Sequence, residues 1–219
     1  MKSWREVEGF FDYPYLYDNV ISAAQPGDVI VEIGSWMGQS MAYLAQGLQA
    51  KGWTGSLFSV DTFTGELNQP AHQPIVAAAG GSIRHLFDAN MRECGVSDMV
   101  HVMQCDSAQA ASNLPDGSVS FCFIDAAHDY ASVMRDILAW VPKMKPGGML
   151  AGHDYHDRDV HTAVAECFAG TGYMVAGSCW IKHMPTNMTP ADWHDAIKRG
   201  EVITRSRHPD HPLVAAEKK

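Results

Sequence analysis

Four side chains able to do catalytic or metal-binding chemistry follow two short apolar runs in the second half of the sequence. Asp125 directly follows the first run, and His128 comes three residues later. His153 and Asp154 directly follow the second run. If the runs are neighbouring parallel strands, their carboxyl ends point Asp125 and Asp154 at one place. Such a convergence of acids predicts either a divalent-cation site or a paired acid–base site.

A glycine turn nearer the N-terminus predicts a nucleoside-like ligand. Val29–Ile33 is apolar and β-branched, as in a strand buried on both faces, and it carries Glu32 near its end. Gly34 and Gly38 follow, and a run with helical spacing begins at Gln39. The dinucleotide fingerprint G-x-G-x-x-G is absent here, and a carboxylate before the turn suits a positively charged ligand better than a diphosphate. A tight turn without any ligand is the alternative.

The remaining pattern is that of an α/β domain with acids at strand ends. Asp61 ends a second apolar run at the place where ribose-binding acids occur, although a helix N-cap is its alternative role. Asp106 follows a third run. The segment from Thr62 to Ser82 contains prolines and glycines that leave little room for a regular helix, which predicts an active-site flap. Strands are predicted over residues 29–33, 56–61, 99–104, 119–125 and 149–152.

Composition limits the function classes. With 219 residues and 46% hydrophobic content, the chain is long enough for one domain with a sizeable core. A net charge of −9 argues against a nucleic-acid partner, because such binding depends on basic surface. The five cysteines are scattered without a C-x-x-C pair, so they predict neither a disulfide framework nor a cysteine zinc site. With no membrane-length apolar segment or signal peptide, the sequence predicts a cytoplasmic protein without a membrane partner.

The ordered set of motifs resembles the class I S-adenosylmethionine-dependent methyltransferases, and within them the small-molecule O-methyltransferases that use a divalent cation. The resemblance covers roughly residues 28–170. It implies an α/β fold, a doubly wound, Rossmann-like seven-stranded sheet of order 3-2-1-4-5-7-6 with helices on both faces. Residues 173–178 and 179–183 would supply its two final strands. The residues that carry it are Val31–Ser40, Ser59–Phe63, Asp106–Ser107, Phe123–Tyr130, Lys145–Gly148 and Gly152–Tyr155.

The resemblance implies roles for individual residues in binding S-adenosyl-L-methionine. Glu32 and the turn would hold the methionine part and the sulfonium side, with Gly34, Ser35, Gly38, Gln39 and Ser40 as the turn residues. Asp61 would bind the ribose hydroxyls, with Thr62 and Phe63 nearby. Asp106 would bind the adenine amino group with Ser107 beside it, and Asp125 is also counted among the cofactor residues.

The family's metal site maps to Asp125, His153 and Asp154. His153 departs from the usual acidic or amide ligand. Oxygen ligands suit Mg²⁺, whereas an imidazole shifts the preference toward Mn²⁺, Fe²⁺, Co²⁺ or Zn²⁺, so the resemblance leaves the identity of the cation open. Several relatives carry a general base at the position of His128, which predicts that this imidazole removes the acceptor's hydroxyl proton. A capping or core histidine is the alternative.

The sequence as a whole predicts an O-methyltransferase for a small hydroxylated acceptor such as a sugar, a phenol or a polyketide. Residues 1–185 would form one methyltransferase domain that begins with an aromatic segment, and residues 186–219 a C-terminal helix and a frayed tail. A homodimer is one candidate assembly. The alternatives are a metal-independent methyltransferase acting on nitrogen or on a macromolecule, and a non-catalytic nucleoside-binding module of the same fold.

Overall fold

The computed structural model describes residues 1–66, 69–169 and 171–198. Its seven strands follow the order β3-β2-β1-β4-β5-β7-β6 in one sheet, with helices on both sides, which confirms the predicted fold class and strand order. By its internal contacts the chain divides into two compact units, Met1–Asp106 and Ser107–Lys219. The domain boundary expected near residue 185 stays a prediction.

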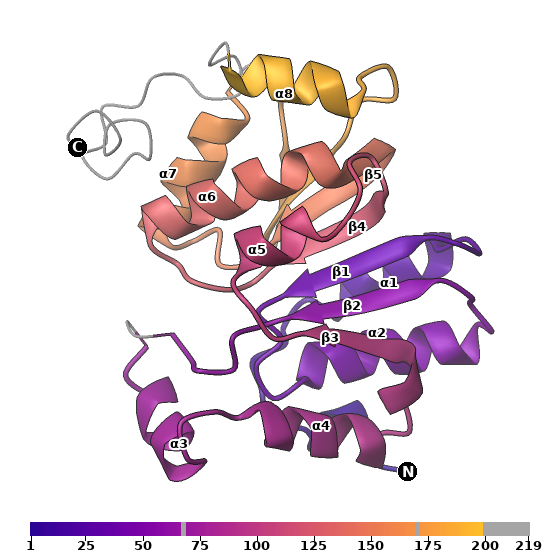
Figure 1. Ribbon diagram of the computed structural model, residues 1–219, viewed down its shortest axis with the longest axis vertical. Helices are drawn as coiled ribbons and strands as arrows, with labels where there is room; N and C mark the ends of the chain where they lie inside the picture. The colour runs from indigo at the N-terminus through magenta and orange to yellow at the C-terminus, as the bar shows by residue number, and fades with distance from the viewer. Residues whose placement is uncertain (67–68, 170, 199–219) are drawn as a thin grey trace. The chain divides into compact units, whose positions relative to one another are not determined.

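The first unit is built on three parallel strands, in which β1 pairs with β2 and β2 pairs with β3 (Figure 1). Because parallel strands leave their carboxyl ends at the same edge, the residues after β1, β2 and β3 belong to one edge of this unit. The elements of the unit are η1 (Trp4–Glu6), α1 (Pro14–Ala23), β1 (Val29–Ile33), α2 (Gln39–Ala50), β2 (Ser56–Val60), α3 (His72–Ala78), α4 (Arg84–Glu93), η2 (Ser97–Met99) and β3 (Val100–Met103).

Helix α2 begins where the sequence predicts, directly after the glycine turn. Its buried positions Met41, Leu44, Ala45 and Leu48 recur at helical spacing, so one stripe of the helix faces the core. Helix α1 packs against α2, and the ring of Phe11 contacts that of Tyr43 on α2. The N-terminal aromatic segment therefore packs onto the first unit.

One prediction for this unit was wrong. The segment between Thr62 and Ser82 contains helix α3, despite its prolines and glycines. Pro74 lies in the first turn of this seven-residue helix, where the missing backbone N–H of proline would have no helical acceptor. A proline in the first turn is therefore compatible with a helix, and the prolines of this segment did not exclude one.

The second unit joins parallel and antiparallel strands. β4 pairs with β5 in parallel, whereas β7 runs antiparallel to both β5 and β6. Helix α6 contacts both α5 and α7 (Figure 1). The elements are α5 (Ser107–Ser112), β4 (Val119–Ile124), α6 (Tyr130–Trp140), η3 (Val141–Lys143), β5 (Met144–Gly152), α7 (Arg158–Cys167), β6 (Met174–Ala176), β7 (Cys179–His183) and α8 (Pro190–Lys198).

Aspartate side chains start both long helices of this unit. Asp129 accepts a hydrogen bond from the backbone N–H of Ser132 at the start of α6. Asp157 accepts from the N–H groups of Asp159 and Val160 at the start of α7. These caps satisfy N–H groups that have no partner within the helix, and they fix where each helix begins.

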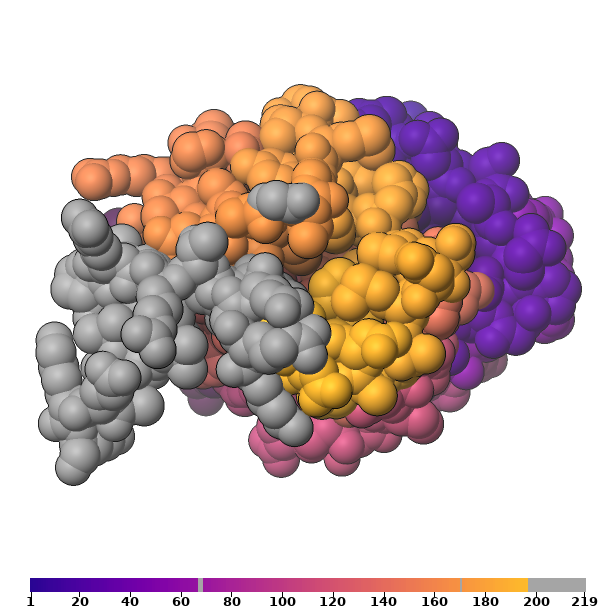
Figure 2. Space-filling view, turned by 90° about the horizontal axis from the view of Figure 1, so that it is seen from above, coloured from indigo at the N-terminus to yellow at the C-terminus, as the bar shows by residue number. Residues whose placement is uncertain are grey.

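Helix α8 packs on the second unit through buried Trp193 and Ala196, and it forms part of the surface in Figure 2. His194 of α8 contacts Asp116 at 2.8 Å. The predicted frayed tail lies outside the described residues. Within the described part of the chain, no helix combines the length and the apolar character that crossing a bilayer requires.

Candidate functional site

The glycine turn after β1 adopts a backbone that requires its glycines. Gly34 and Gly38 have φ angles of 85° and 92°, and Trp36 between them has a φ of 51°. A Cβ atom at Gly38 would lie 2.5 Å from the Cε atom of Met91. Glycine at position 38 therefore serves both the left-handed turn and the close approach of α4.

Glu32 and Ser35 are buried around this turn and are held by neighbouring side chains. Glu32 is 0% exposed, and its Oε2 accepts a hydrogen bond from the hydroxyl of Tyr17 at 2.6 Å. The hydroxyl of Ser59 on β2 donates to that of Ser35 at 2.8 Å. These contacts fix the end of β1 and the start of the turn.

The start of α2 also holds neighbouring segments in place. The side-chain amide of Gln39 donates to the carbonyl of Val7 at 2.8 Å, and Ser40 is buried. The side-chain amide of Asn90 on α4 donates to the carbonyl of Met37 at 2.9 Å. The Gln39 side chain thus connects the start of α2 to the N-terminal segment, and the Asn90 side chain connects α4 to the backbone of the turn.

Asp61 connects the turn to the loop after β2. Its Oδ2 accepts from the backbone N–H of Trp36 at 2.8 Å, and its Oδ1 accepts from that of Phe63 at 2.6 Å. Phe63 is buried with a φ of 58°, whereas Thr62 is exposed. Each carboxylate oxygen has two lone pairs, so these bonds are compatible with further donors from a ligand.

A second contact connects the same turn to α3. The rings of Trp36 and His72 stack with their centroids 4.1 Å apart and 23° between their planes. The Nδ1 atom of His72 accepts from the backbone N–H of Glu66 at 3.3 Å. The sequence analysis did not predict this pair, and no sequence pattern around either residue indicates the contact.

The two residues expected near the adenine lie on either side of the division between the units. Asp106 is the last residue of the first unit and is half-buried. Ser107 is the first residue of the second unit and begins α5. Its hydroxyl accepts a hydrogen bond from the indole N–H of buried Trp140 at 2.9 Å.

The ends of β4 and β5 bring together the polar residues of the second unit. The backbone N–H of His153 donates to the carbonyl of Ile124 at 3.0 Å, which extends the strand pairing by one residue. A Cβ atom at Gly152 would lie 2.6 Å from this carbonyl and from the ring of Trp180. Only glycine therefore fits directly before the histidine, and Asp154 follows with a left-handed φ of 52°.

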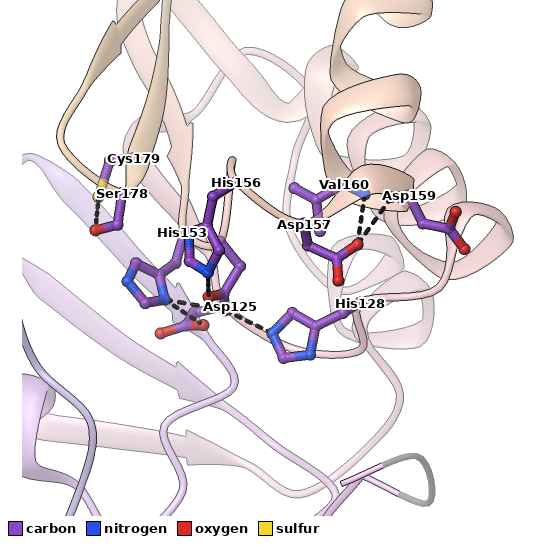
Figure 3. Close-up of polar contacts among 10 residues, drawn as sticks. Asp125, His128, His153, His156, Asp157, Asp159, Val160, Ser178 and Cys179 are labelled. Atoms are coloured by element: carbon purple, nitrogen blue, oxygen red, sulfur yellow. Dashed lines mark hydrogen bonds and ion pairs between the residues drawn. The ribbon is translucent and has the colours of Figure 1, made fainter.

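The side chains meet in a mixed cluster of carboxylates and imidazoles (Figure 3). His128 Nε2 lies 2.7 Å from Asp154 Oδ2. His153 Nδ1 lies 3.0 Å from Asp154 Oδ2 and 3.5 Å from Asp125 Oδ1. One potential ligand atom from each of Asp125, His128 and Asp154 lies within 4.8 Å of the other two. This group contains two of the three residues expected to hold a cation, with His128 in place of His153.

The electrostatics of this cluster follow from burial and from charge pairing. Burial lowers the pKa of His153, but its hydrogen bonds with Asp125 and Asp154 outweigh that effect and raise the pKa to about 11. Burial raises the pKa of Asp154, but hydrogen bonds from His128 and His153 hold it well below its ordinary value. In this arrangement, the His153 imidazole compensates part of the charge of the carboxylates.

Comparisons with known proteins give the family. Residues 31–155, which are more than half of the chain, match the model described as methyltransferase domain. The chain belongs to this family. All of the residues that we expected to bind the cofactor or a cation lie within the matched range.

Two solved structures share the fold of this methyltransferase domain. The O-methyltransferase NovP is 17% identical with a TM-score of 0.59, over 78% of this chain and 77% of NovP. Cofactor-bound Rv0187 from MTB is 18% identical with a TM-score of 0.58, over 83% of this chain and 84% of Rv0187. At these identities the likeness concerns the fold, which is that of the class I methyltransferases.

A curated relative is similar over part of its length. The protein y4gI of Sinorhizobium fredii is 25% identical over 130 residues, which are 59% of this chain but 13% of y4gI. The chain therefore spans a small part of this relative.

Proposed function

We propose that this methyltransferase domain transfers the methyl group of S-adenosyl-L-methionine to a hydroxyl group of a small molecule, assisted by a divalent cation. Membership of the methyltransferase family supports the transfer reaction. The observation that carries the finer proposal is the convergence of Asp125, His128 and Asp154, whose ligand atoms lie within 4.8 Å of one another. NovP, described as an O-methyltransferase, has the same fold and is consistent with a hydroxyl acceptor.

The first unit supplies most of the residues proposed to hold the cofactor. The turn of Gly34 and Gly38 allows backbone to approach the methionine part, and Glu32 lies just before it. Asp61 is proposed to accept hydrogen bonds from the ribose hydroxyls. Its two bonds from backbone N–H groups already orient the carboxylate and reduce the entropy lost on binding.

The adenine end of the cofactor is proposed to contact Asp106 and Ser107. Asp106 would accept a hydrogen bond from the exocyclic amino group. The contact between Ser107 and Trp140 restricts the position of the serine hydroxyl. Both residues follow β3 in the chain.

The donor set of the second unit fits a divalent cation. Two carboxylates and an imidazole are a common ligand combination for such ions, and a cavity there is lined by Asp125, His128 and His153. When bound, the cation would supply positive charge beside the acceptor oxygen and favour its deprotonation. The chain's own contribution is to hold the ligand groups close together and partly shielded from water.

His128 has two roles compatible with this proposal. As the predicted general base, its imidazole would accept the hydroxyl proton of the acceptor, and Asp154 would orient the ring from 2.7 Å. As a ligand, it would complete the cation site with Asp125 and Asp154. The acceptor itself is proposed to be a sugar, a phenol or a polyketide.

Two measurements test the proposal separately. Calorimetric titration with S-adenosyl-L-methionine should give a saturable heat, and Asp61→Asn should weaken it. Methyl transfer to a panel of sugars, phenols and polyketides should stop with EDTA and return with added divalent cation. A domain that gave no saturable heat would contradict the cofactor assignment. Methylation of a hydroxyl that is unaffected by EDTA would contradict the role of the cation.

A further inference from the structure

The cluster at the ends of β4 and β5 presents nitrogen as well as oxygen to the space between its members. Asp125, His128 and Asp154 each offer one ligand atom, all within 4.8 Å of one another. The His128 Nε2 atom is 2.7 Å from the nearer carboxylate oxygen of Asp154. Ligands bound to one ion at about 2.1 Å stand about 3.0–3.4 Å apart when adjacent. The three donors therefore need only small movements to share an ion.

We infer that His128 is a ligand of the cation, and that the site is a mixed carboxylate–imidazole centre which selects a transition-metal ion over Mg²⁺. This inference rests on the proposed function, because it names the class of cation that the same site takes. It changes the predicted role of His128 from general base to ligand, and it replaces His153 by His128 in the ligand set.

The position of His128 supports this assignment. The residue lies directly before Asp129, whose side chain caps α6 and so fixes the local backbone. Its Nε2 atom lies 2.7 Å from the carboxylate of Asp154. This nitrogen therefore lies beside one of the two carboxylates with which it forms a possible ligand group.

Asp154 is held in a conformation that directs its carboxylate into the cluster. Its φ of 52° is left-handed, a conformation that is uncommon outside glycine but that aspartate adopts more readily than most residues. The backbone N–H of Asp157 donates to the Asp154 carbonyl at 2.8 Å and helps to hold this turn. The carboxylate is therefore placed before an ion binds.

His153 has a supporting part in this arrangement. Its Nδ1 contacts the carboxylates of both Asp125 and Asp154, at 3.5 Å and 3.0 Å. Residues that hydrogen-bond to ligating carboxylates orient them and tune the affinity for the ion. His153 is thus a positioning residue, with its backbone fixed by the carbonyl of Ile124.

The ligand chemistry decides the class of ion. Mg²⁺ takes oxygen ligands almost exclusively, in a strict octahedron, and keeps several of its waters. Imidazole nitrogen suits Mn²⁺, Fe²⁺, Co²⁺ and Zn²⁺, whose affinities for such sites exceed that of Mg²⁺. We therefore expect these ions to bind at least about tenfold more tightly than Mg²⁺.

Pulsed electron paramagnetic resonance with Mn²⁺ alone tests the inference without an activity measurement. The full chain is stripped of metal and loaded with Mn²⁺, and the spectrum is examined for ¹⁴N coupling from a directly bound imidazole. The variants are His128→Ala, His128→Gln and His153→Ala, with His183→Ala as a control at an exposed histidine of β7. The glutamine variant keeps a hydrogen-bonding group near Asp154 in case the alanine variant does not fold.

The expected result is ¹⁴N coupling in the wild type, in His153→Ala and in His183→Ala, and its loss in both His128 variants. Mn²⁺ affinity should fall at least about tenfold without His128, since even outer partners of metal ligands contribute that much. Coupling that survives in His128→Gln would overturn the inference and leave the proposed cation intact. Loss of coupling in His153→Ala alone would restore the predicted ligand set. Failure of Mn²⁺ to bind the wild type would overturn both the inference and the cation of the proposed function.

Discussion

The contact between Tyr17 and Glu32 gives a sharp prediction about stability. Both side chains are 0% exposed, and the tyrosine hydroxyl donates to the carboxylate at 2.6 Å. Tyr17→Phe removes this donor and keeps the ring. A hydrogen bond to a charged group contributes about 1.5–3 kcal/mol, and a buried carboxylate cannot replace the lost donor with bulk water. We expect the free energy of unfolding to fall by about 2 kcal/mol, which lowers the melting temperature by about 4–8 °C.

A matched variant shows whether the loss of stability in Tyr17→Phe depends on burial or follows from removing any tyrosine hydroxyl that contacts a carboxylate. Tyr43 donates to Asp18 at an exposed position, so Tyr43→Phe removes a similar bond in a different environment. Water and salt weaken exposed interactions with carboxylates, and the cost there should stay below about 1 kcal/mol. Urea denaturation of both variants, followed by circular dichroism, compares the two free energies of unfolding.

A double-mutant cycle tests the pair directly. Glu32→Gln is combined with Tyr17→Phe, and a coupling energy of about 1.5–3 kcal/mol is expected from the charged hydrogen bond. Equal losses of stability in Tyr17→Phe and Tyr43→Phe would refute the argument from burial. A coupling energy near zero would show that the hydroxyl does not stabilise the carboxylate.

Three further predictions concern the glycine turn, the acid after β2 and the attachment of α8. Gly38→Ala forces alanine into a left-handed backbone, which destabilises the fold by about 1–2 kcal/mol. Its Cβ atom would also lie 2.5 Å from the Cε atom of Met91 on α4. Both the melting temperature and the affinity for S-adenosyl-L-methionine measured by calorimetry should therefore fall. In Asp61→Asn, an amide NH₂ group replaces one of the two carboxylate oxygens that accept hydrogen bonds from backbone N–H groups. We expect the affinity for S-adenosyl-L-methionine to fall by about tenfold or more. An unchanged affinity would contradict the role of Asp61. Hydrogen bonds from Lys143 and His194 lower the pKa of Asp116, so its stabilising contribution is present at neutral pH and is lost as the pH falls through the lowered pKa. Urea midpoints of Asp116→Asn should therefore depend less on acidification than those of the wild type, and parallel pH profiles would contradict this.

The sequence by itself located the strands and the acids that follow them, and the family resemblance gave the strand order. Strand β5, however, begins at Met144 and not at Met149 as predicted. A run of apolar, β-branched residues indicates a strand that is buried on both faces of its sheet. This local property is enough to locate β1, β2 and β4. The order of glycines and acids along the chain then indicated the family. Asp125 and Asp154 could be expected at one place, because neighbouring parallel strands end at the same edge of a sheet.

Only the tertiary structure decided which side chains meet. Tyr17 belongs to α1 and Glu32 to β1, and the spacing of the two residues in the sequence does not predict a hydrogen bond between them. The distances from His128 and His153 to Asp154 depend on where the cap of α6 begins and on the left-handed backbone of Asp154. Periodicity reports how each segment is buried on its own, whereas contacts between segments depend on packing and backbone conformation that no single segment encodes.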